Sequence, residues 1–571
     1  MKNKKNLVLI IMGIFSLIVA FIMTILPVSS SFGSKNISFK SSYKENEVTL
    51  KGTFYEKENA KYGVLICPGY SCDRAKWRPM ANVFLANNIS VMTFDYSGQG
   101  GSYGKIGFDN AKTDDIPTQI DDALVYLHNI SNIDYENIIL MGHSMGGRAI
   151  LRLMYDYNID SADTKLTKKN VKNIILFSPE VNYEHNAQAS LFAATDDEND
   201  YPWKDYSPEA VKGVNVYLFG STADDVVSDY DILRISERLS GEKVQESGTA
   251  DLIIYSEYGN TIKVGVTSLV LHSYQMYSYR FASYLSSSIT SITGIVSVYP
   301  SIFLSFVYLG WILSLVGIGI ILYTLFNVKT NVENITEEIP MITSTKSFLL
   351  RKLLLWIPGL IMGFIICCIC MVFPFGSPIM NIPYMCCIAG YGIIMLIFYL
   401  KKKVKGVDGV LPKITFKIKS DKKEIIKCLV ISIVFIVYVW FILKMTMYNL
   451  IPLNIRIFWL IFATALMTIG YYISSVENDM LKIINASKWT YVLYNLIQYV
   501  ALFLFVLFYL IIKSYSGFIG QMQNMILMYV FTIPLGNYIQ RKLNNRIYGA
   551  IVSSFLFQAI MITSAAIISF F

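Results

Sequence analysis

The sequence predicts an α/β domain, with a mostly parallel sheet covered by helices on both faces, joined to an all-α multi-pass transmembrane domain. Three observations carry this prediction. Short apolar, β-branched runs alternate with helix-like segments through residues 35–290. Long uncharged apolar runs fill residues 291–571. Hydrophobic residues make up 54% of the 571, which is too large a share for a water-soluble protein.

The first segment, residues 1–34, is expected to cross a membrane. Lysines precede an uncharged apolar run from Leu7 to Leu26, and about 20 such residues span the core of a bilayer. Small residues at 28–31 also permit a cleaved signal peptide. The run exceeds the apolar region of about 7–15 residues that a signal peptide has, so an uncleaved anchor is favoured. In either case the positive end stays in the cytoplasm and the next domain lies outside.

The α/β domain carries a serine on a predicted strand-to-helix turn. An apolar run leads into Gly-His-Ser-Met-Gly-Gly at 142–147, and a segment with helical spacing follows. In this setting Gly-x-Ser-x-Gly forms a sharp turn that exposes the hydroxyl of Ser144, and Gly142 and Gly146 allow the crowded backbone. The motif alone is weak, because Gly and Ser are common residues.

The partners that such a serine needs follow in the expected chain order. A serine hydroxyl is a poor nucleophile unless a histidine takes its proton and a carboxylate orients that histidine. A predicted strand at 214–220 runs into Asp224 and Asp225, at the sheet edge where sites gather. Of four histidines, only His272 follows both Ser144 and these acids. Asp224 and Asp225 are adjacent and at most one of them can reach His272, so both are candidate acids at this point.

Two backbone N–H groups are predicted to form an oxyanion hole. An apolar strand at 62–67 ends in Pro68-Gly69, so the N–H of Tyr70 can point at the site. The N–H of Met145, directly after the nucleophile at the start of a helix, is the other donor. An ordinary turn is the alternative interpretation of Pro68-Gly69.

Together these residues resemble the α/β-hydrolase superfamily, and most closely its serine aminopeptidases, monoacylglycerol lipases and related esterases. The likeness is carried by residues 68–70, by Asp-Tyr-Ser-Gly-Gln-Gly-Gly-Ser at 95–102, by the serine turn, and by Asp224 with His272. Relative to the family pattern, Gly101 is an additional residue before Ser102. The family pattern of a strand, a glycine, an aspartate, a small residue and Val-Val puts Asp224 in the position of the acid, so Asp224 is preferred and Asp225 is the alternative. The resemblance implies an α/β-hydrolase fold over the domain at 35–290, with a small cap at about 180–213.

About eight further spans are predicted after the α/β domain. They lie at 295–326, 353–374, 380–400, 424–446, 454–474, 489–512, 518–537 and 547–570. Lysine and arginine concentrate in every second loop, at 327–352, 401–423, 475–488 and 538–546. This bias places those loops in the cytoplasm and the α/β domain outside the cell membrane. The spans hold few ionisable residues and no opposed pair in mid-span, which argues against a proton-coupled transporter.

Several classes of function are not expected. The net charge of +8 is explained by the basic loops, so nucleic acid binding is not predicted. The sequence has neither a Cys/His spacing typical of zinc nor a nucleotide-binding glycine motif, so no metal and no cofactor are expected. The abundance of Asn, Ile and Lys suggests an AT-rich bacterium.

The resemblance and the membrane spans together predict a membrane-bound serine hydrolase, similar to esterases and lipases, that cleaves an acyl ester through an acyl-enzyme on Ser144. One alternative is a serine peptidase of the same fold that acts on short peptides. The other is a non-catalytic hydrolase-like binding domain on a membrane receptor or transporter. The expected partners are a small-molecule, lipid or peptide substrate and membrane lipid.

Overall fold

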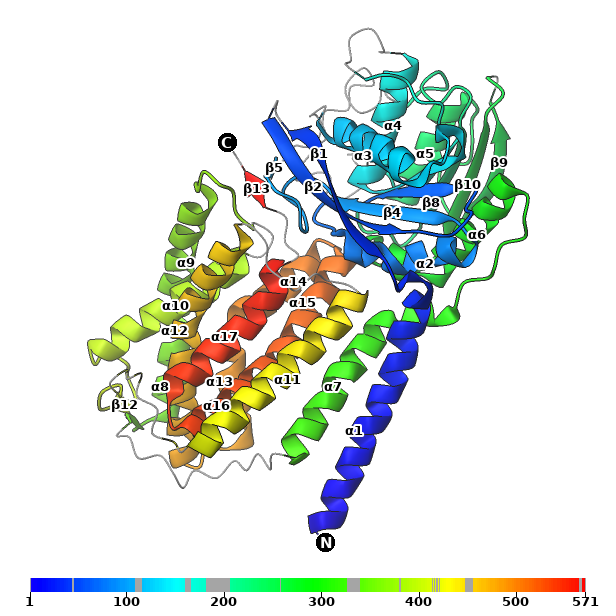
Figure 1. Ribbon diagram of the computed structural model, residues 1–571. Coiled ribbons are helices and arrows are strands. Elements are labelled where there is room, and N and C mark those ends of the chain that lie inside the picture. The colour runs from blue at the N-terminus through cyan, green and yellow to red at the C-terminus, as the bar shows by residue number, and fades with distance from the viewer. Residues whose placement is uncertain are drawn as a thin grey trace.

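The protein, seen in a computed structural model, has an α/β domain above a bundle of helices (Figure 1). The N-terminal helix descends beside the bundle, and the last strand of the chain returns to the α/β domain. The structure describes residues 2–43, 46–107, 115–159, 166–180, 206–256, 258–325, 339–378, 382–412, 414, 416, 420, 422–446, 455–563 and 567–569.

A nine-stranded sheet in the order β1-β2-β4-β3-β6-β7-β8-β10-β9 forms the centre of the α/β domain. Neighbours from β4 to β10 in that order run parallel, whereas the pairs β1–β2, β2–β4 and β9–β10 are antiparallel. The predicted mostly parallel sheet is therefore confirmed. The strands are β1 (Lys35–Tyr43), β2 (Asn46–Tyr55), β3 (Gly63–Cys67), β4 (Ser90–Asp95), β6 (Ile138–His143), β7 (Asn173–Phe177), β8 (Asn215–Ser221), β9 (Ala250–Tyr255) and β10 (Thr261–Thr267).

Helices cover both faces of the sheet because its central strands are apolar on both sides. Along β3, for example, Val64 and Ile66 join the core on one face, while Leu65 and Cys67 join the core on the other. The first core also includes buried residues of the helical bundle, so the α/β domain and the bundle share apolar packing. Helices α2 (Arg78–Ala86) and α6 (Tyr279–Thr293) cover that face, and α3 (Asp115–Ser131), α4 (Met145–Asn158) and α5 (Asp229–Ser240) cover the opposite one (Figure 1).

Long apolar helices occupy the predicted membrane half. Within the described residues, six helical segments are long and apolar enough to cross a bilayer. They are 4–31, 302–322, 345–371, 382–400, 456–483 and 515–543. The predicted span at 424–446 corresponds to α11 (Lys422–Thr446). The structure describes the backbone of this helix and only some of its side chains.

Two predicted spans differ from single long helices. The span at 489–512 is two helices, α13 (Lys488–Gln498) and α14 (Val500–Ile511), bent by 69° where they meet. At the bend, the buried side chain of Gln498 accepts a hydrogen bond from Lys352 of a neighbouring helix. The span at 547–570 is the shorter helix α17 (Arg546–Thr563).

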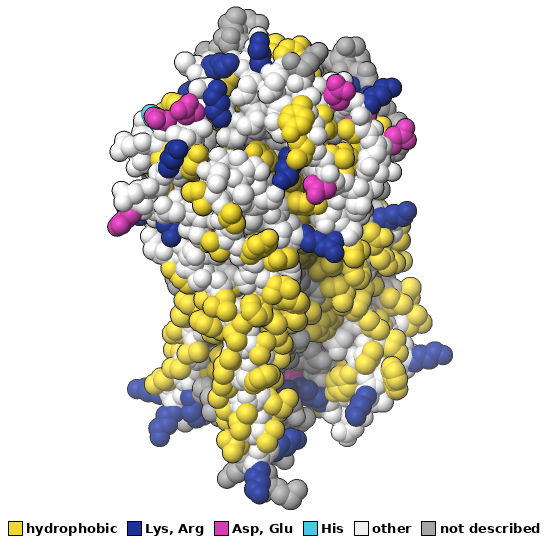
Figure 2. All heavy atoms as spheres, turned by 90° about the vertical axis from the view of Figure 1, so that its right-hand side faces the viewer, with side chains coloured by type: hydrophobic (Ala, Val, Ile, Leu, Met, Phe, Trp, Pro, Cys, Tyr) yellow, Lys and Arg dark blue, Asp and Glu magenta, His cyan; other side chains and the backbone are white. Residues whose placement is uncertain are grey.

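The surface of the bundle is mostly apolar, whereas the surface of the α/β domain carries charged side chains. Figure 2 shows hydrophobic side chains over the lower half of the molecule, with lysine and arginine side chains along its lower margin. On α1 (Lys2–Ile25), for example, the hydrophobic side chains of Leu7, Ile11 and Phe15 are exposed. Apolar surface of this extent is typical of contact with lipid.

The bundle also contains a buried ion pair that the sequence did not predict. Lys352 of α8 (Thr345–Leu354) lies 2.5 Å from Glu477 of α12 (Arg456–Ile483), and both side chains are fully buried. The hydroxyls of two tyrosines also donate to this carboxylate. The sequence assigned Glu477 to a cytoplasmic loop, but α12 continues as a helix to Ile483 and carries Glu477 into the bundle.

Glycines let α1 pack closely along α7 (Val307–Leu325). A Cβ atom at Gly13 would lie 3.0 Å from the carbonyl oxygen of Gly317, and a Cβ atom at Gly317 would lie 2.9 Å from that of Gly13. Small residues at such positions allow the backbones of membrane helices to approach. The predicted N-terminal span is therefore packed against the next span of the chain.

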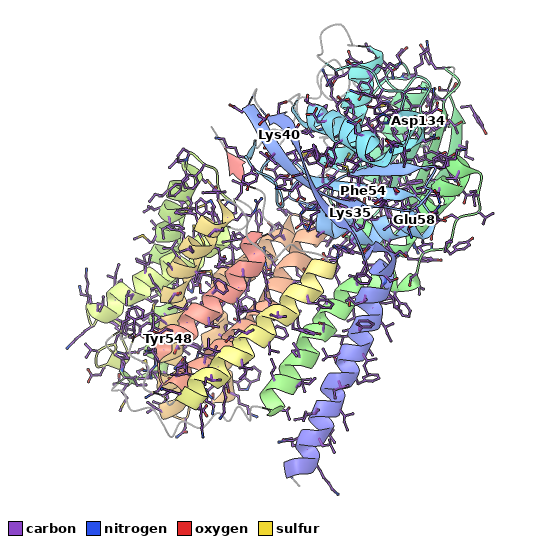
Figure 3. All side chains as sticks on the ribbon, viewed as in Figure 1. Lys35, Lys40, Phe54, Glu58, Asp134 and Tyr548 are labelled. Atoms are coloured by element: carbon purple, nitrogen blue, oxygen red, sulfur yellow. The ribbon has the colours of Figure 1, made fainter. Side chains whose placement is uncertain are left out.

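Charged residues lie along the β1 edge of the sheet. Lys35 and Lys40 lie on the edge strand β1 (Figure 3). They pair with Glu56 and Glu47, each at 2.5 Å. Lysines on an edge strand hinder pairing with a second chain. The charged edge and the apolar bundle therefore lie in different parts of the molecule.

Candidate active site

Ser144 occupies a strained turn between β6 and α4. Its backbone angles are φ 51° and ψ −123°, a conformation that non-glycine residues rarely adopt. Neighbouring segments hold this conformation. The N–H of Ser144 donates to the carbonyl of Phe177 at 3.0 Å, and the N–H of Glu180 donates to the carbonyl of Ser144 at 3.0 Å. The local geometry is that of the strand-to-helix turn that the sequence predicts.

The glycines around Ser144 are required by close backbone contacts. A Cβ atom at Gly142 would lie 2.7 Å from the backbone of Gly146, and one at Gly146 would lie 2.3 Å from the carbonyl oxygen of Cys67. A Cβ atom at Gly69 would lie 3.1 Å from the Cβ of Ser144. The end of β3 and the start of α4 therefore touch, and the loop after β3 reaches the serine.

The two predicted oxyanion donors lie on these touching segments. Tyr70 follows Gly69, whose backbone lies against Ser144. Met145 is the first residue of α4, and the first N–H groups of a helix have no acceptor within the helix. Both residues therefore lie next to the serine turn, and their role as oxyanion donors stays a prediction.

His272 and Asp224 lie in direct contact. Asp224 follows β8, and His272 begins the 3₁₀ helix η7 (His272–Tyr277) beyond β10. Nδ1 of His272 is 3.0 Å from each carboxylate oxygen of Asp224. The two side chains are 7% and 0% exposed, so water does not weaken this contact. A carboxylate at Nδ1 favours the tautomer in which Nε2 is the basic nitrogen.

The imidazole of His272 is placed beside the serine turn. The ring centroids of His272 and His143 are 4.6 Å apart, and His143 directly precedes Ser144. The hydrogen bonds found among the described residues do not include one between Ser144 and His272. The structure thus brings Ser144, His272 and Asp224 to one edge of the sheet and gives a direct contact for the last two.

Asp224 is held by donors that the sequence did not single out. Its Oδ1 accepts from the N–H groups of Val226 and Val227 at 2.8 Å each. Its Oδ2 accepts from Nε2 of Gln275 at 2.6 Å, and the same nitrogen contacts Oγ of Ser178 at 2.7 Å. Gln275 lies in the same short helix as His272, and this proximity is the sequence signal that could have identified it.

Asp225, the alternative acid, has different partners. Its Oδ1 accepts from the N–H of His272 at 3.2 Å and from Oγ of Ser516 at 2.7 Å. Its Oδ2 accepts from the N–H of Ser516 at 2.8 Å. Asp225 therefore contacts the backbone of His272 and a turn of the membrane domain, whereas the described contact with the imidazole belongs to Asp224.

The charges around His272 favour its protonated form. Burial lowers the pKa of His272, but the carboxylates of Asp224, Asp225 and Glu180 outweigh this effect and raise it above the ordinary 6.5. Burial holds the pKa of His143 well below 6.5, and the charge of His272 lowers it further. The two neighbouring rings therefore differ strongly in basicity, and His272 is the one suited to carry a proton.

The loop at 95–102 is a structural support of the site. The carboxylate of Asp95 accepts from the backbone N–H of Arg74 at 2.7 Å, from its guanidinium, and from the N–H of Gly101 at 2.8 Å. Oγ of Ser102 donates to the carbonyl of Asp95 at 2.5 Å. The loops after β3 and β4 are therefore tied together.

Most of the predicted cap at about 180–213, and His185, lie outside the described residues.

Comparison with known proteins gives one family. Residues 58–196 match the family model described as serine aminopeptidase, S33. The match includes the loop after β3 and the serine turn, and it ends before Asp224 and His272. No curated protein matches the chain.

Solved structures with a similar α/β domain are distant in sequence. An esterase from Pyrococcus furiosus is 17% identical, with 46% of this chain and 92% of that chain covered and a TM-score of 0.32. A thermostable carboxyl esterase from Bacillus coagulans in complex with glycerol is 13% identical, with 46% and 99% covered and a TM-score of 0.32. A predicted CIB-like hydrolase from Thermoplasma acidophilum is 15% identical, with 46% and 98% covered and a TM-score of 0.29.

Proposed function

Because the N-terminal half of this chain contains an α/β-hydrolase domain and the rest contains several long apolar helices, we propose that the protein is a membrane-bound serine hydrolase. In this proposal it cleaves an acyl ester through an acyl-enzyme on Ser144. The observation that carries the proposal is the buried contact between Nδ1 of His272 and Asp224, beside the strained turn that holds Ser144.

The proposed reaction uses each residue in a defined role. Nε2 of His272 takes the proton of the Ser144 hydroxyl as its oxygen attacks the carbonyl carbon of the ester. Asp224 holds the imidazole and stabilises its positive charge. The N–H groups of Met145 and Tyr70 bind the oxyanion of the tetrahedral intermediate. His272 then gives its proton to the departing alkoxide. In the second half of the reaction His272 takes a proton from water as the water oxygen attacks the acyl-enzyme, and it returns that proton to the oxygen of Ser144 as the acid leaves.

A serine peptidase is the second candidate, and one residue favours it. The side chain of Glu180 is 29% exposed, and its charge is one of those that raise the pKa of His272, so its carboxylate lies near the proposed site. A carboxylate in this position could bind the ammonium group of a peptide. Arg148 lies 3.8 Å from Glu180 and partly neutralises it, so the ester remains the first choice. A screen of acyl esters against short peptides separates the two candidates.

The proposed location is the cell membrane, with the hydrolase domain outside the cytoplasm. The basic N-terminus and the basic margin of the bundle lie at the same end, opposite the hydrolase domain (Figures 1 and 2). This distribution supports the proposed orientation, because positively charged segments stay in the cytoplasm.

The first experiment is labelling with a fluorophosphonate probe, which reacts with activated serines. In membranes that contain the full chain, we expect labelling of the wild type and at least about a hundredfold less labelling of Ser144→Ala and His272→Ala, since removal of either residue disables the nucleophile. His128→Ala is the matched control, because His128 lies on α3 and contacts Ile133 and Tyr135.

Each result has a definite meaning. Loss of labelling in both site variants, with His128→Ala labelled normally, supports the serine hydrolase. A wild type that stays unlabelled while a known hydrolase is labelled in the same membranes would contradict it, and the non-catalytic binding domain would then be the better interpretation.

A further inference from the structure

The proposed active site is joined to the membrane domain by one buried carboxylate. We propose that Asp225 is a positioning residue, and that its bonds to Ser516 let the first turn of α15 (Tyr515–Ile526) fix the loop that carries His272. The membrane domain would then be a working part of the active site as well as its anchor. This inference rests on the serine hydrolase function proposed above.

The first step is the set of contacts around Asp225. Ser516 donates twice, from Oγ at 2.7 Å and from its N–H at 2.8 Å, and Ser514 donates from Oγ at 3.4 Å. On the other side, the N–H of His272 donates at 3.2 Å. The N–H of Ser273 also contacts Oγ of Ser516 at 3.5 Å. One carboxylate therefore joins the backbone of His272 to a turn of the membrane domain.

The second step is the energetic state of this carboxylate. Asp225 is 9% exposed, and a buried carboxylate is costly unless hydrogen bonds satisfy it. Among the donors that the structure gives for Asp225, only His272 belongs to the hydrolase domain. Without the turn, the carboxylate would have to reach water, and its backbone would move. Asp224 is the preceding residue, so such a movement would displace the partner of the His272 ring.

The third step is that other site loops are held in the same way. The carbonyl of Gly98, in the loop after β4, accepts from the guanidinium of Arg456 at 2.8 Å and from the N–H of Ile567 at 2.8 Å. Lys105, further along the same loop, donates to the carbonyl of Pro374 at 3.2 Å. Segments of the membrane domain therefore contact the loops that follow β4, β8 and β10. The bundle lies against the sheet edge that carries the proposed triad.

Asp225 also leaves an electrostatic signature that a purely structural residue would not leave. The groups that face the His272 ring are Asp224, Asp225, Glu180 and the uncharged His143. The negative charge of Asp225 contributes to the raised pKa of His272. Replacement of this charge lowers the pKa of His272, and the acid limb of the pH–rate profile then moves to lower pH.

The test uses the full chain in detergent micelles, with p-nitrophenyl butyrate as substrate. We expect Asp225→Asn and Ser516→Ala each to lower kcat about tenfold, with KM within about twofold of wild type, because a charged hydrogen bond is lost. The double variant should be no worse than Asp225→Asn, because both changes break the same contact. The acid limb should move to lower pH in Asp225→Asn and not in Ser516→Ala.

Two controls separate this role from general loss of structure. Asp122→Asn removes another aspartate that accepts from a serine, Ser41, at 2.6 Å, and it should leave kcat unchanged. Ser516→Thr keeps a hydroxyl and should recover most of the activity. If Asp225→Asn proves unstable, Ser516→Ala and Ser516→Thr alone decide the question.

The outcomes are distinguishable from failure of the proposed function. An active wild type with unchanged kcat in both Asp225→Asn and Ser516→Ala overturns the positioning role and leaves the hydrolase intact. Equal losses in Ser516→Ala and Ser516→Thr also overturn it. A wild type without esterase activity and without fluorophosphonate labelling refutes the hydrolase and, with it, this inference.

Discussion

At the scale of single residues, two adjacent aspartates have the same chemistry and different partners. Asp224 contacts the imidazole of His272, while Asp225 contacts the backbone of His272 and the membrane domain. Both charges, together with that of Glu180, act on the same ring. The protonation of His272 is therefore the property of the site that is most sensitive to its surroundings.

This property gives a prediction on pH. His272 can accept a proton from Ser144 only when its ring is neutral, and its pKa lies above 6.5. The rate of labelling by the fluorophosphonate probe should therefore rise with pH through a midpoint above 6.5 and fall away in acid. Labelling rates of the full chain between about pH 5 and 9 test this. A midpoint below 6.5 would contradict the described environment of His272.

Residue types and their order were enough to select Ser144, Asp224 and His272 from the sequence as candidates. The family pattern favoured Asp224, but residue types and their order alone could not choose between Asp224 and Asp225, because one residue of displacement along the chain decides which carboxylate meets the ring. It also could not identify Ser516 as a partner of Asp225, because the two residues meet only through the packing of two domains.

At the scale of elements, the serine turn depends on the contact between the end of β3 and the start of α4. Gly146 is the point of closest approach, where a Cβ atom would lie 2.3 Å from the carbonyl oxygen of Cys67 and 2.5 Å from that of Pro68. Both neighbouring atoms belong to the backbone, so a side-chain rotation cannot relieve the clash.

We therefore predict that Gly146→Ala separates α4 from β3. The variant should lose about 1–3 kcal/mol of stability from overpacking, and fluorophosphonate labelling should fall because Ser144 moves relative to the loop of Tyr70. Thermal unfolding in detergent and labelling measure the two effects. Gly520→Ala is the control, since no atom lies within 4 Å of the added Cβ. Normal labelling of Gly146→Ala would show that the turn tolerates displacement.

The central strands β3, β6 and β8 and most of the membrane helices could be predicted from hydrophobic patterns, because burial on both sheet faces and exposure to lipid each impose a simple pattern. The break between α13 and α14 could not be predicted in this way. The two helices taken together are apolar enough to be predicted as one span, and the bend coincides with a contact between Gln498 and Lys352, which is distant in sequence.

At the scale of the whole molecule, the basic segments and the hydrolase domain lie at opposite ends of the apolar bundle. A bilayer around the bundle would therefore have the hydrolase domain on one side and most of the exposed lysines of the membrane half on the other. In the orientation proposed above, which follows the positive-inside rule, the second side faces the cytoplasm.

This arrangement predicts how two exposed positions react in intact cells. Lys61→Cys, in the hydrolase domain, should react with a membrane-impermeant maleimide, and Lys401→Cys, after α10 (Ile382–Leu400), should react only after the cells are opened. The wild type, with its native cysteines, gives the background. The reverse pattern would place the hydrolase domain in the cytoplasm.

The pairing of β13 (Ile568–Ser569) with β5 (Ile106–Gly107) has a consequence for the order of synthesis. The ribosome completes the hydrolase domain before it makes any of the helices that follow, and it reaches Ile567 long after Gly98. The loop that holds Gly98 therefore acquires this partner only once α17 has been translated. A chain shortened before Ile567 would contain Ser144 and His272 without this support of the loop, so the proposed activity would depend on a segment that is made more than four hundred residues after the serine turn.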